Sequence, residues 1–281
     1  MNDLLLRYQQ DLILRGFSKA TIYNYSLSLR NFLKYCDRPA DDIDLALIKE
    51  YLVYMIRDRK LSNSSVRIAH GAIRYFFSRT LSRPLNIDNI PQMMKQTKLP
   101  VALSFDQVYK ILTSAANLKH KALLTLIYSS GLRVSEITRI KPGDILRDNM
   151  RLRVTQAKGG KDRYTVLSVK CLALLEKYWR AYRPTEWLFP GRNPGSPLSV
   201  RACQHAFEIA LRKSGIGKTC GIHTLRHSFA THTLETGGGI FQPRKLLGHK
   251  HLKTTLVYVH LQEEKIVIRS PLDVYAKHLD C

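Results

Sequence analysis

The hydrophobic periodicity of the first ninety residues is the feature that most limits how this chain can fold. Apolar side chains recur there every three or four positions, which is the period of one face of an α-helix. Ser18, Asp44 and the sequence SNSS at 62–65 stand immediately before three such stretches, where N-cap residues are expected. A further helix is expected over residues 4–14. The periodic side chains are predicted to form a helical core; they are Ile22, Tyr25, Leu29, Phe32, Leu33, Ile48, Tyr51, Leu52, Met55, Ile56, Val66, Ala69, Ile73, Phe76 and Phe77.

The periodicity is interrupted in a stretch, residues 91–100, that begins and ends with proline and carries Lys95 and Lys98. Proline disfavours helix in the residue before it, so this stretch favours an extended connection. Ser104 and Gln107 then have the spacing of a capping box, which marks a new helix. The expected organisation is a helical domain at 1–90, a linker at 91–100 and a second domain at 101–281.

Within the second domain the pattern changes between residues 151 and 168. Apolar and polar residues alternate there on both sides of the sequence KGGK at 158–161, which predicts a β-hairpin. Helical periodicity returns after Ser168 and again after Ser199. The alternating apolar residues are Leu152, Val154, Tyr164 and Val166. We therefore expect a mainly α protein with a small antiparallel β-sheet (α+β), in which a helical domain precedes a mixed α/β domain.

The net charge points to a polyanionic partner. The chain has 45 Lys and Arg against 22 Asp and Glu, a formal charge of +23. Residues 1–100 contain 16 basic and 9 acidic side chains and the remainder contains 29 and 13, so both domains are positive. A surface of this kind binds nucleic acid chiefly through its phosphates.

The sequence offers no sign of export or membrane insertion. An acid at position 3 does not fit a signal peptide, and no apolar run approaches the roughly 18 residues of a membrane span. The odd number of cysteines and their spacing, without a CxxC pair, predict reduced thiols in the cytoplasm. The five are Cys36, Cys171, Cys203, Cys220 and Cys281.

Four separated features of the second domain carry side chains suited to phosphodiester chemistry. They are GLRVSE at 131–136, just past an expected helix end at Gly131; Lys158 in the hairpin turn; HTLRH at 223–227 with LLGHK at 246–250; and TTLVYVH at 254–260. Guanidiniums bind phosphate oxygens through a planar fork and keep their charge. A Lys or His transfers protons, and a Tyr phenol makes a reversible covalent link.

In this order and spacing, these sequences resemble the signature boxes of the tyrosine recombinase family (phage-integrase type), and its Xer, integron and transposon branches in particular. The resemblance covers nearly the whole chain: the first part is similar to the family's SAM-like core-binding domain and the second to its catalytic domain. It implies a site-specific enzyme that cleaves and rejoins double-stranded DNA through a 3′-phosphotyrosyl intermediate. It also implies a dimer on each site, a homotetramer on two sites, and no metal, ATP or other cofactor.

The resemblance assigns a role to each matching residue. Arg133 and Arg226 would hold the scissile phosphate, and Tyr258 would attack it. Lys158 would protonate the leaving 5′ oxygen, while His223 would act as general acid/base beside the tyrosine.

Supporting roles follow in the same way. His249 would hydrogen-bond the phosphate, Glu136 would orient the arginines, and His260 would support the site from its edge. The side chains expected to bind DNA around the site are Lys95, Lys98, Lys161 and Arg163.

Two details depart from the family pattern. Three glycines at 237–239 and Pro243 stand where the family has a more helical run, which leaves the placement of His249 open. Lys161 flanks the same turn as Lys158, so either lysine could be the general acid, although Lys158 matches the family position. His223 and His227 are spaced like metal ligands, but the glutamate of HExxH is missing, so we expect no metal.

Two other functions remain open from the sequence. A type IB topoisomerase shares this chemistry but acts alone and relaxes supercoils. A DNA-binding accessory protein without activity is the other, and the intact set of residues argues against it. The segment after Tyr258 carries apolar residues that would dock into a neighbouring protomer or pack against this chain's own core.

Overall fold

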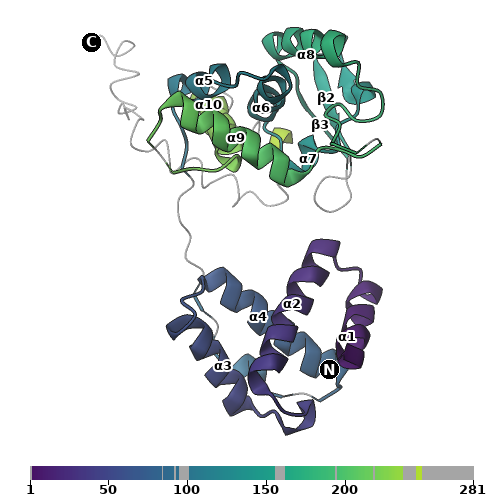
Figure 1. Ribbon diagram of the computed structural model, residues 1–281, viewed down its shortest axis with the longest axis vertical. Coiled ribbons are helices and arrows are strands. Elements are labelled where there is room, and N and C mark those ends of the chain that lie inside the picture. Colours follow the sequence, from purple (N-terminus) through teal and green to yellow (C-terminus); the bar gives the residue numbers. More distant parts are fainter. Residues whose placement is uncertain are drawn as a thin grey trace, which may run out of the picture. The chain divides into compact units, whose positions relative to one another are not determined.

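The structure is a computed structural model that describes residues 2–83, 85–91, 93–94, 101–155, 162–193, 195–217, 219–236 and 245–248. The chain forms two compact units, Met1–Lys98 and Leu99–Cys281 (Figure 1). The boundary between them falls inside the stretch predicted as linker.

The first unit is helical, as predicted. Ser18, Asp44 and Ser62 each cap a helix, and their side chains accept hydrogen bonds from the backbone N–H groups of Thr21, Leu47 and Ser65, respectively. Its elements are α1 (Asn2–Leu14), α2 (Lys19–Cys36), η1 (Ala40–Asp42), α3 (Leu45–Arg57), α4 (Asn63–Tyr75), the π-helical turn η2 (Phe76–Thr80) and η3 (Ile87–Asn89).

Aromatic rings fill the core of this unit. Tyr8, Phe32 and Phe76 are fully buried, and the Tyr8 hydroxyl donates a hydrogen bond to the Ala72 carbonyl oxygen (3.0 Å), so its polar atom is satisfied. The predicted core is confirmed for most of the periodic residues. It is wrong for Ile56, which is 38% exposed, because the residue lies at the edge of the buried face of α3 that Leu52 and Met55 occupy.

The second unit combines helices with one small sheet. Figure 1 shows the strands toward one end of this unit and α5 and α10 toward the other. Its elements are α5 (Phe105–Thr113), α6 (Leu118–Ser130), α7 (Val134–Ile137), η4 (Pro142–Asp144), β1 (Ile145–Leu146), β2 (Arg151–Val154), β3 (Arg163–Val166), α8 (Val169–Tyr182), α9 (Val200–Ser214) and α10 (His223–Glu235).

The sheet has the order β1-β2-β3 and is antiparallel throughout. Leu152 faces Thr165 and Val154 faces Arg163 in its register, so these four side chains share one face. That face is buried, whereas Tyr164 and Val166 are 51% and 38% exposed. The predicted strands are confirmed, but in β3 it is the polar residues that point inward. β1 escaped prediction because two residues are too few to show alternation.

Helix α6 lies at the centre of this unit and packs against α5, α8, α9, α10 and β3. Six of its residues are almost completely buried, because neighbouring elements cover the helix on most sides: Ala122, Leu123, Leu124, Leu126, Ile127 and Ser130. It ends at Gly131, as predicted, in the left-handed conformation (φ +61°). A Cβ there would collide with the ring of Phe229, so glycine is required both for the turn and for the close packing of α10.

Candidate active site

The predicted phosphate-binding site begins directly after the Gly131 turn. Arg133 precedes the first turn of α7, and its backbone N–H donates a hydrogen bond to the Glu136 carboxylate (Oε2, 2.8 Å). The Arg133 guanidinium also donates to that carboxylate (Nη1 to Oε1, 2.7 Å). Glu136 therefore fixes Arg133 at both its backbone and its side chain.

Glu136 is the centre of an arginine cluster. Only 5% of it is exposed, and both of its oxygens accept hydrogen bonds from the Arg163 guanidinium at 2.8 Å. Arg226 Nη1 lies 3.7 Å from Glu136 Oε2. One buried carboxylate is thus in contact with three guanidiniums, and the cluster keeps a net positive charge.

The charge state of Glu136 follows from these partners. Burial alone would raise its pKa, but the hydrogen bonds and charge of Arg163, with the hydrogen bonds of Arg133, outweigh burial and lower the pKa of Glu136 to about 2. The carboxylate is therefore ionised at neutral pH.

Arg226 comes from α10 and is held by two backbone carbonyls. Its Nη1 donates to the Gly131 oxygen (2.5 Å) and its Nη2 to the Leu247 oxygen (2.8 Å). These carbonyls belong to the end of α6 and to residues 245–248. The structure thus brings the arginines of GLRVSE and HTLRH to the same carboxylate, although 93 positions separate them in the sequence.

His223 is the first residue of α10, three residues before Arg226, and its side chain is partly exposed to solvent. Partial burial lowers its pKa, and the positive charges of Arg226 and Arg133 lower the pKa of His223 further. The imidazole is therefore neutral at pH 7 and able to accept a proton. His227, one turn later, has its pKa lowered to about 4 by burial and by the charges of His223 and Arg226.

Arg163 was predicted to bind DNA, but the structure places it inside the protein. Its side chain is 10% exposed, and its Nε donates to the Leu246 carbonyl (3.0 Å) in addition to the two bonds to Glu136. The strand register could have indicated this, because a residue opposite Val154 points to the buried face. The contact between Arg163 and Glu136 was missed in the sequence.

Several predicted residues lie outside the described part of the chain. They are Lys95, Lys98, Lys158, Lys161, His249, Tyr258 and His260. The glycines at 237–239, Pro243 and the segment after Tyr258 lie outside it as well. Among the residues that are described, no group of three or more His, Cys, Asp or Glu is placed to hold a metal ion. No helix within the described ranges is long and apolar enough to span a membrane.

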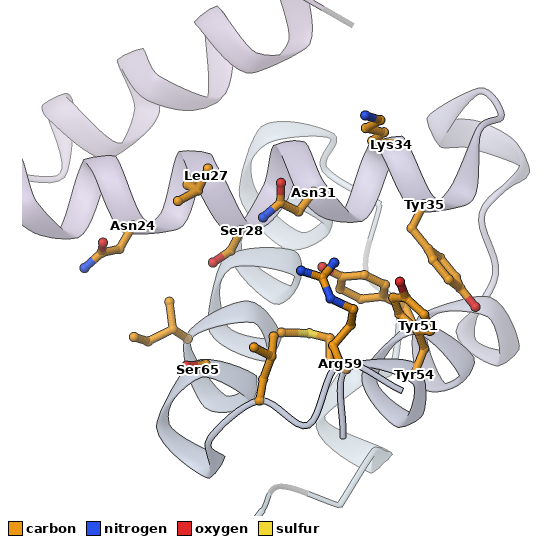
Figure 2. Close-up of a pocket in the computed structure, with 13 residues that line it drawn as sticks. Asn24, Leu27, Ser28, Asn31, Lys34, Tyr35, Tyr51, Tyr54, Arg59 and Ser65 are labelled. Carbon is orange, nitrogen blue, oxygen red and sulfur yellow. The ribbon is translucent and has the colours of Figure 1, made fainter. Parts of the chain in front are cut away.

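The first unit has an open groove of about 570 Å³ beside α2. Figure 2 shows Asn24, Ser28 and Asn31 along α2, with Arg59 and Tyr51 on the other side of the groove. Its lining mixes polar and apolar side chains and includes the basic Lys34 and Arg59 but no acidic residue. Hydrogen-bonding side chains without negative charge suit a phosphate-bearing ligand.

Comparison with known proteins places both units in one family. Residues 102–265 match the phage integrase family, and residues 4–87 match the phage integrase N-terminal SAM-like domain. The chain is 40% identical to the integrase/recombinase-like protein y4qK of Sinorhizobium fredii over 96% of this chain and 88% of that one. It is 31% identical to the tyrosine recombinase XerD of Listeria innocua over 95% and 96% of the two chains.

A solved structure shows the same fold. A lambda integrase dimer bound to a COC′ core site aligns with 90% of this chain and 96% of its own, at 22% identity and a TM-score of 0.74. The mainly helical architecture with a small three-stranded antiparallel sheet is therefore that of the lambda integrase fragment.

Proposed function

Because the chain belongs to the phage integrase family, we propose that it is a site-specific tyrosine recombinase that cleaves and rejoins double-stranded DNA through a 3′-phosphotyrosyl bond to Tyr258. One observation carries the proposal: Arg133 and Arg226, from two separate boxes, are held against the same buried carboxylate. Such a pair suits the charge that builds on two non-bridging phosphate oxygens as the nucleophile attacks. The names of XerD and lambda integrase support the same activity.

The arginine pair acts by electrostatic stabilisation. Two guanidiniums would repel each other in water, but Glu136 holds both in place before DNA arrives, so little reorganisation is needed during the reaction. Arg133 is the more accessible of the two, with 24% of its side chain exposed against 6% for Arg226. We therefore assign Arg133 the outer face of the scissile phosphate and Arg226 the inner one.

Proton transfers complete the cycle. Neutral His223 accepts the phenol proton of Tyr258 as the oxygen attacks phosphorus, and Lys158 gives a proton to the leaving 5′ oxygen. His249 hydrogen-bonds the phosphate and His260 supports the site. In religation a 5′ hydroxyl attacks the phosphotyrosine, so the bond energy is conserved and neither ATP nor a metal is required.

Polar and basic side chains outside the active site would bind the DNA. The groove beside α2 provides Asn31, Lys34 and Arg59 for one side of the duplex. Lys95, Lys98 and Lys161 would neutralise phosphates of the bound duplex. Since lambda integrase is found as a dimer on its core site, we expect a dimer per site and a homotetramer on two sites. With DNA as its substrate, we expect the enzyme to act in the cytoplasm.

Strand exchange distinguishes this function from its alternatives. The full chain is incubated with two duplexes of different length that contain the DNA flanking its gene, and the products are sized. A recombinase yields hybrid lengths. A type IB topoisomerase would instead relax any supercoiled plasmid without producing hybrids, and an accessory protein would bind the duplexes and leave both intact.

A matched pair of tyrosine variants accompanies the assay. Tyr258→Phe removes the proposed nucleophile and should abolish the hybrid products. Tyr164→Phe alters an exposed tyrosine on β3 and should leave them unchanged. Full exchange by Tyr258→Phe would refute the assignment of the nucleophile.

A further inference from the structure

Arg163 makes contacts that phosphate binding does not explain. Every nitrogen of its guanidinium donates a hydrogen bond inside the protein: Nη1 and Nη2 to Glu136, and Nε to the Leu246 carbonyl. The two bonds to Glu136 are parallel and of equal length, 2.8 Å, the fork-on-fork arrangement that fixes the plane of a carboxylate. A side chain engaged in this way is oriented toward the protein interior.

The position of Arg163 on the sheet explains why it reaches the site. It is the first residue of β3 and pairs with Val154, the last residue of β2, so it closes the ladder next to the hairpin turn. Its side chain stands on the buried face with Leu152 and Val154. The contact with Glu136 therefore attaches this end of the hairpin to the start of α7.

The segment 245–248 is built around the same side chain. Gly248 has φ +64°, and a Cβ there would lie 2.7 Å from Arg163 Cδ. Leu246 accepts the Nε hydrogen bond, and the neighbouring Leu247 carbonyl accepts one from Arg226. The glycine thus leaves room for the Arg163 stem directly before His249 in the sequence.

We propose that Arg163 is a positioning residue for the strand-cleavage reaction, which holds the Glu136 carboxylate so that it orients Arg133 and Arg226. The same guanidinium ties β3, the strand that follows Lys158 in the sequence, to residues 245–248, which precede His249. This assignment rests on the proposed function of the site. It gives the third arginine of the cluster a role distinct from DNA binding.

An arginine is required at this position for a geometric reason. Its planar fork bridges both carboxylate oxygens and still offers Nε to Leu246, whereas the ammonium of a lysine cannot do both in fixed directions. Without the fork, only the two hydrogen bonds from Arg133 hold the carboxylate, so its plane is fixed less tightly. Arg133 and Arg226 would then lose their alignment while keeping their charge.

The test compares Arg163→Lys and Arg163→Gln in the full-length protein with Arg153→Lys and Arg153→Gln. Arg153 on β2 is a matched control, because it lies in the same sheet and makes an ion pair with Asp144 of η4 (2.9 Å), but its side chain is 45% exposed. The probes are labelled duplexes that tile the DNA flanking the gene and carry 5′-bridging phosphorothiolates, which trap the covalent product. The rate of adduct formation in a single turnover and the dissociation constant of the DNA are both measured.

The substitutions at Arg163 should change the rate of adduct formation but not the dissociation constant of the DNA. We expect Arg163→Lys to lower the adduct rate about 10-fold and Arg163→Gln about 100-fold, the size of effect that a misplaced site produces. DNA affinity should stay within about threefold, since the overall positive surface is retained. Both Arg153 variants should stay within about twofold of the wild type in rate.

A double-mutant cycle with Glu136→Gln, measured on variants that circular dichroism shows to be folded, tests whether Arg163 acts through Glu136. If Arg163 acts through Glu136, Arg163→Lys should lower the rate much less in the Glu136→Gln background than in the wild type. Equal effects in the two backgrounds, a wild-type rate for both Arg163 variants, or a rate loss that only follows lost DNA affinity would each overturn the proposal. A wild-type protein that forms no adduct would overturn the proposed function itself, and the assignment of Arg163 with it.

Discussion

The Arg163 guanidinium and the Glu136 carboxylate are joined by two parallel hydrogen bonds of 2.8 Å in the interior of the second unit. Glu136 also binds the backbone and the side chain of Arg133, and lies 3.7 Å from Arg226. The predicted phosphate-binding arginines are therefore arranged around an acid and not directly around each other. This arrangement makes Glu136 important for both stability and reactivity.

Glu136→Gln should destabilise the protein by about 3–5 kcal/mol at pH 7, because it breaks a buried ion pair and leaves its arginines uncompensated. The pKa of Glu136 is about 2 in the folded protein, below its usual 4.5. The stabilisation is thus fully present above pH 4.5 and is lost as the pH falls toward 2. Urea unfolding at pH 7, 5 and 3 should show the two proteins converging at low pH.

Glu176→Gln serves as its control. Glu176 pairs with Arg147 near the surface, so its loss should cost less than about 1 kcal/mol. A difference in unfolding free energy between wild type and Glu136→Gln that stays constant from pH 7 to pH 3 would contradict the role given to the ionised carboxylate.

Gly131→Ala should destabilise the protein more than Gly215→Ala. Both glycines end helices with positive φ, at +61° and +68°, so both substitutions carry the backbone cost of about 1–2 kcal/mol. Only at Gly131 does the new methyl group collide with the Phe229 ring and approach Leu247. Thermal unfolding measures the stability of the two variants. Equal losses of stability would show that the close packing of Phe229 against Gly131 is not needed.

Arg133→Gln should raise the pKa of His223. Partial burial lowers the pKa of His223, and the charges of Arg226 and Arg133 lower it further, so removing one charge moves the pKa back toward its usual value. NMR titration of the imidazole protons measures it. The lowered pKa of His120 comes from burial, Lys119 and His205, so it should not change. An unchanged pKa of His223 would place Arg133 too far away to act on it.

Lys158→Met should lose cleavage of an ordinary phosphodiester but retain cleavage of a 5′-bridging phosphorothiolate. The sulfur leaves as a thiolate, whose conjugate acid has a pKa of about 8.5, so it needs no proton from the enzyme. Lys161→Met should change the cleavage rates of the two substrates by nearly the same factor, or leave both rates at the wild-type value. If Lys161→Met shows the selective rescue instead, the general acid is the second lysine of the turn.

The local elements could be predicted from the sequence because they depend on local chemistry. Ser18, Asp44 and Ser62 cap their helices, and Gly131 ends α6, as their residue types indicate. β1 could not be predicted, since two residues carry no measurable period. Ile56 was assigned to the core because helical spacing does not define how wide the buried face is.

The site was only partly predictable for a related reason. Sequence boxes identify Arg133, Arg226 and the acid expected to orient them, Glu136, but do not show that a third arginine binds the same carboxylate. Arg163 looked like a surface cation because its β-strand neighbours, Tyr164 and Val166, are the apolar members of the alternation. The Arg163 side chain points inward because Arg163 pairs with Val154, and this strand pairing is a tertiary contact that the local sequence does not reveal. Burial of a charged residue is predictable only when its partner is known.

The covalent bond to Tyr258 is the central claim, and peptide mapping tests it most directly. The adduct with a phosphorothiolate duplex is digested with nuclease and trypsin, and the peptide of residues 254–265, which contains no other tyrosine, is sequenced by mass spectrometry. The account predicts a nucleotide attached through phosphate to Tyr258. A nucleotide found on any other residue, or an adduct in which this peptide is unmodified, would contradict it.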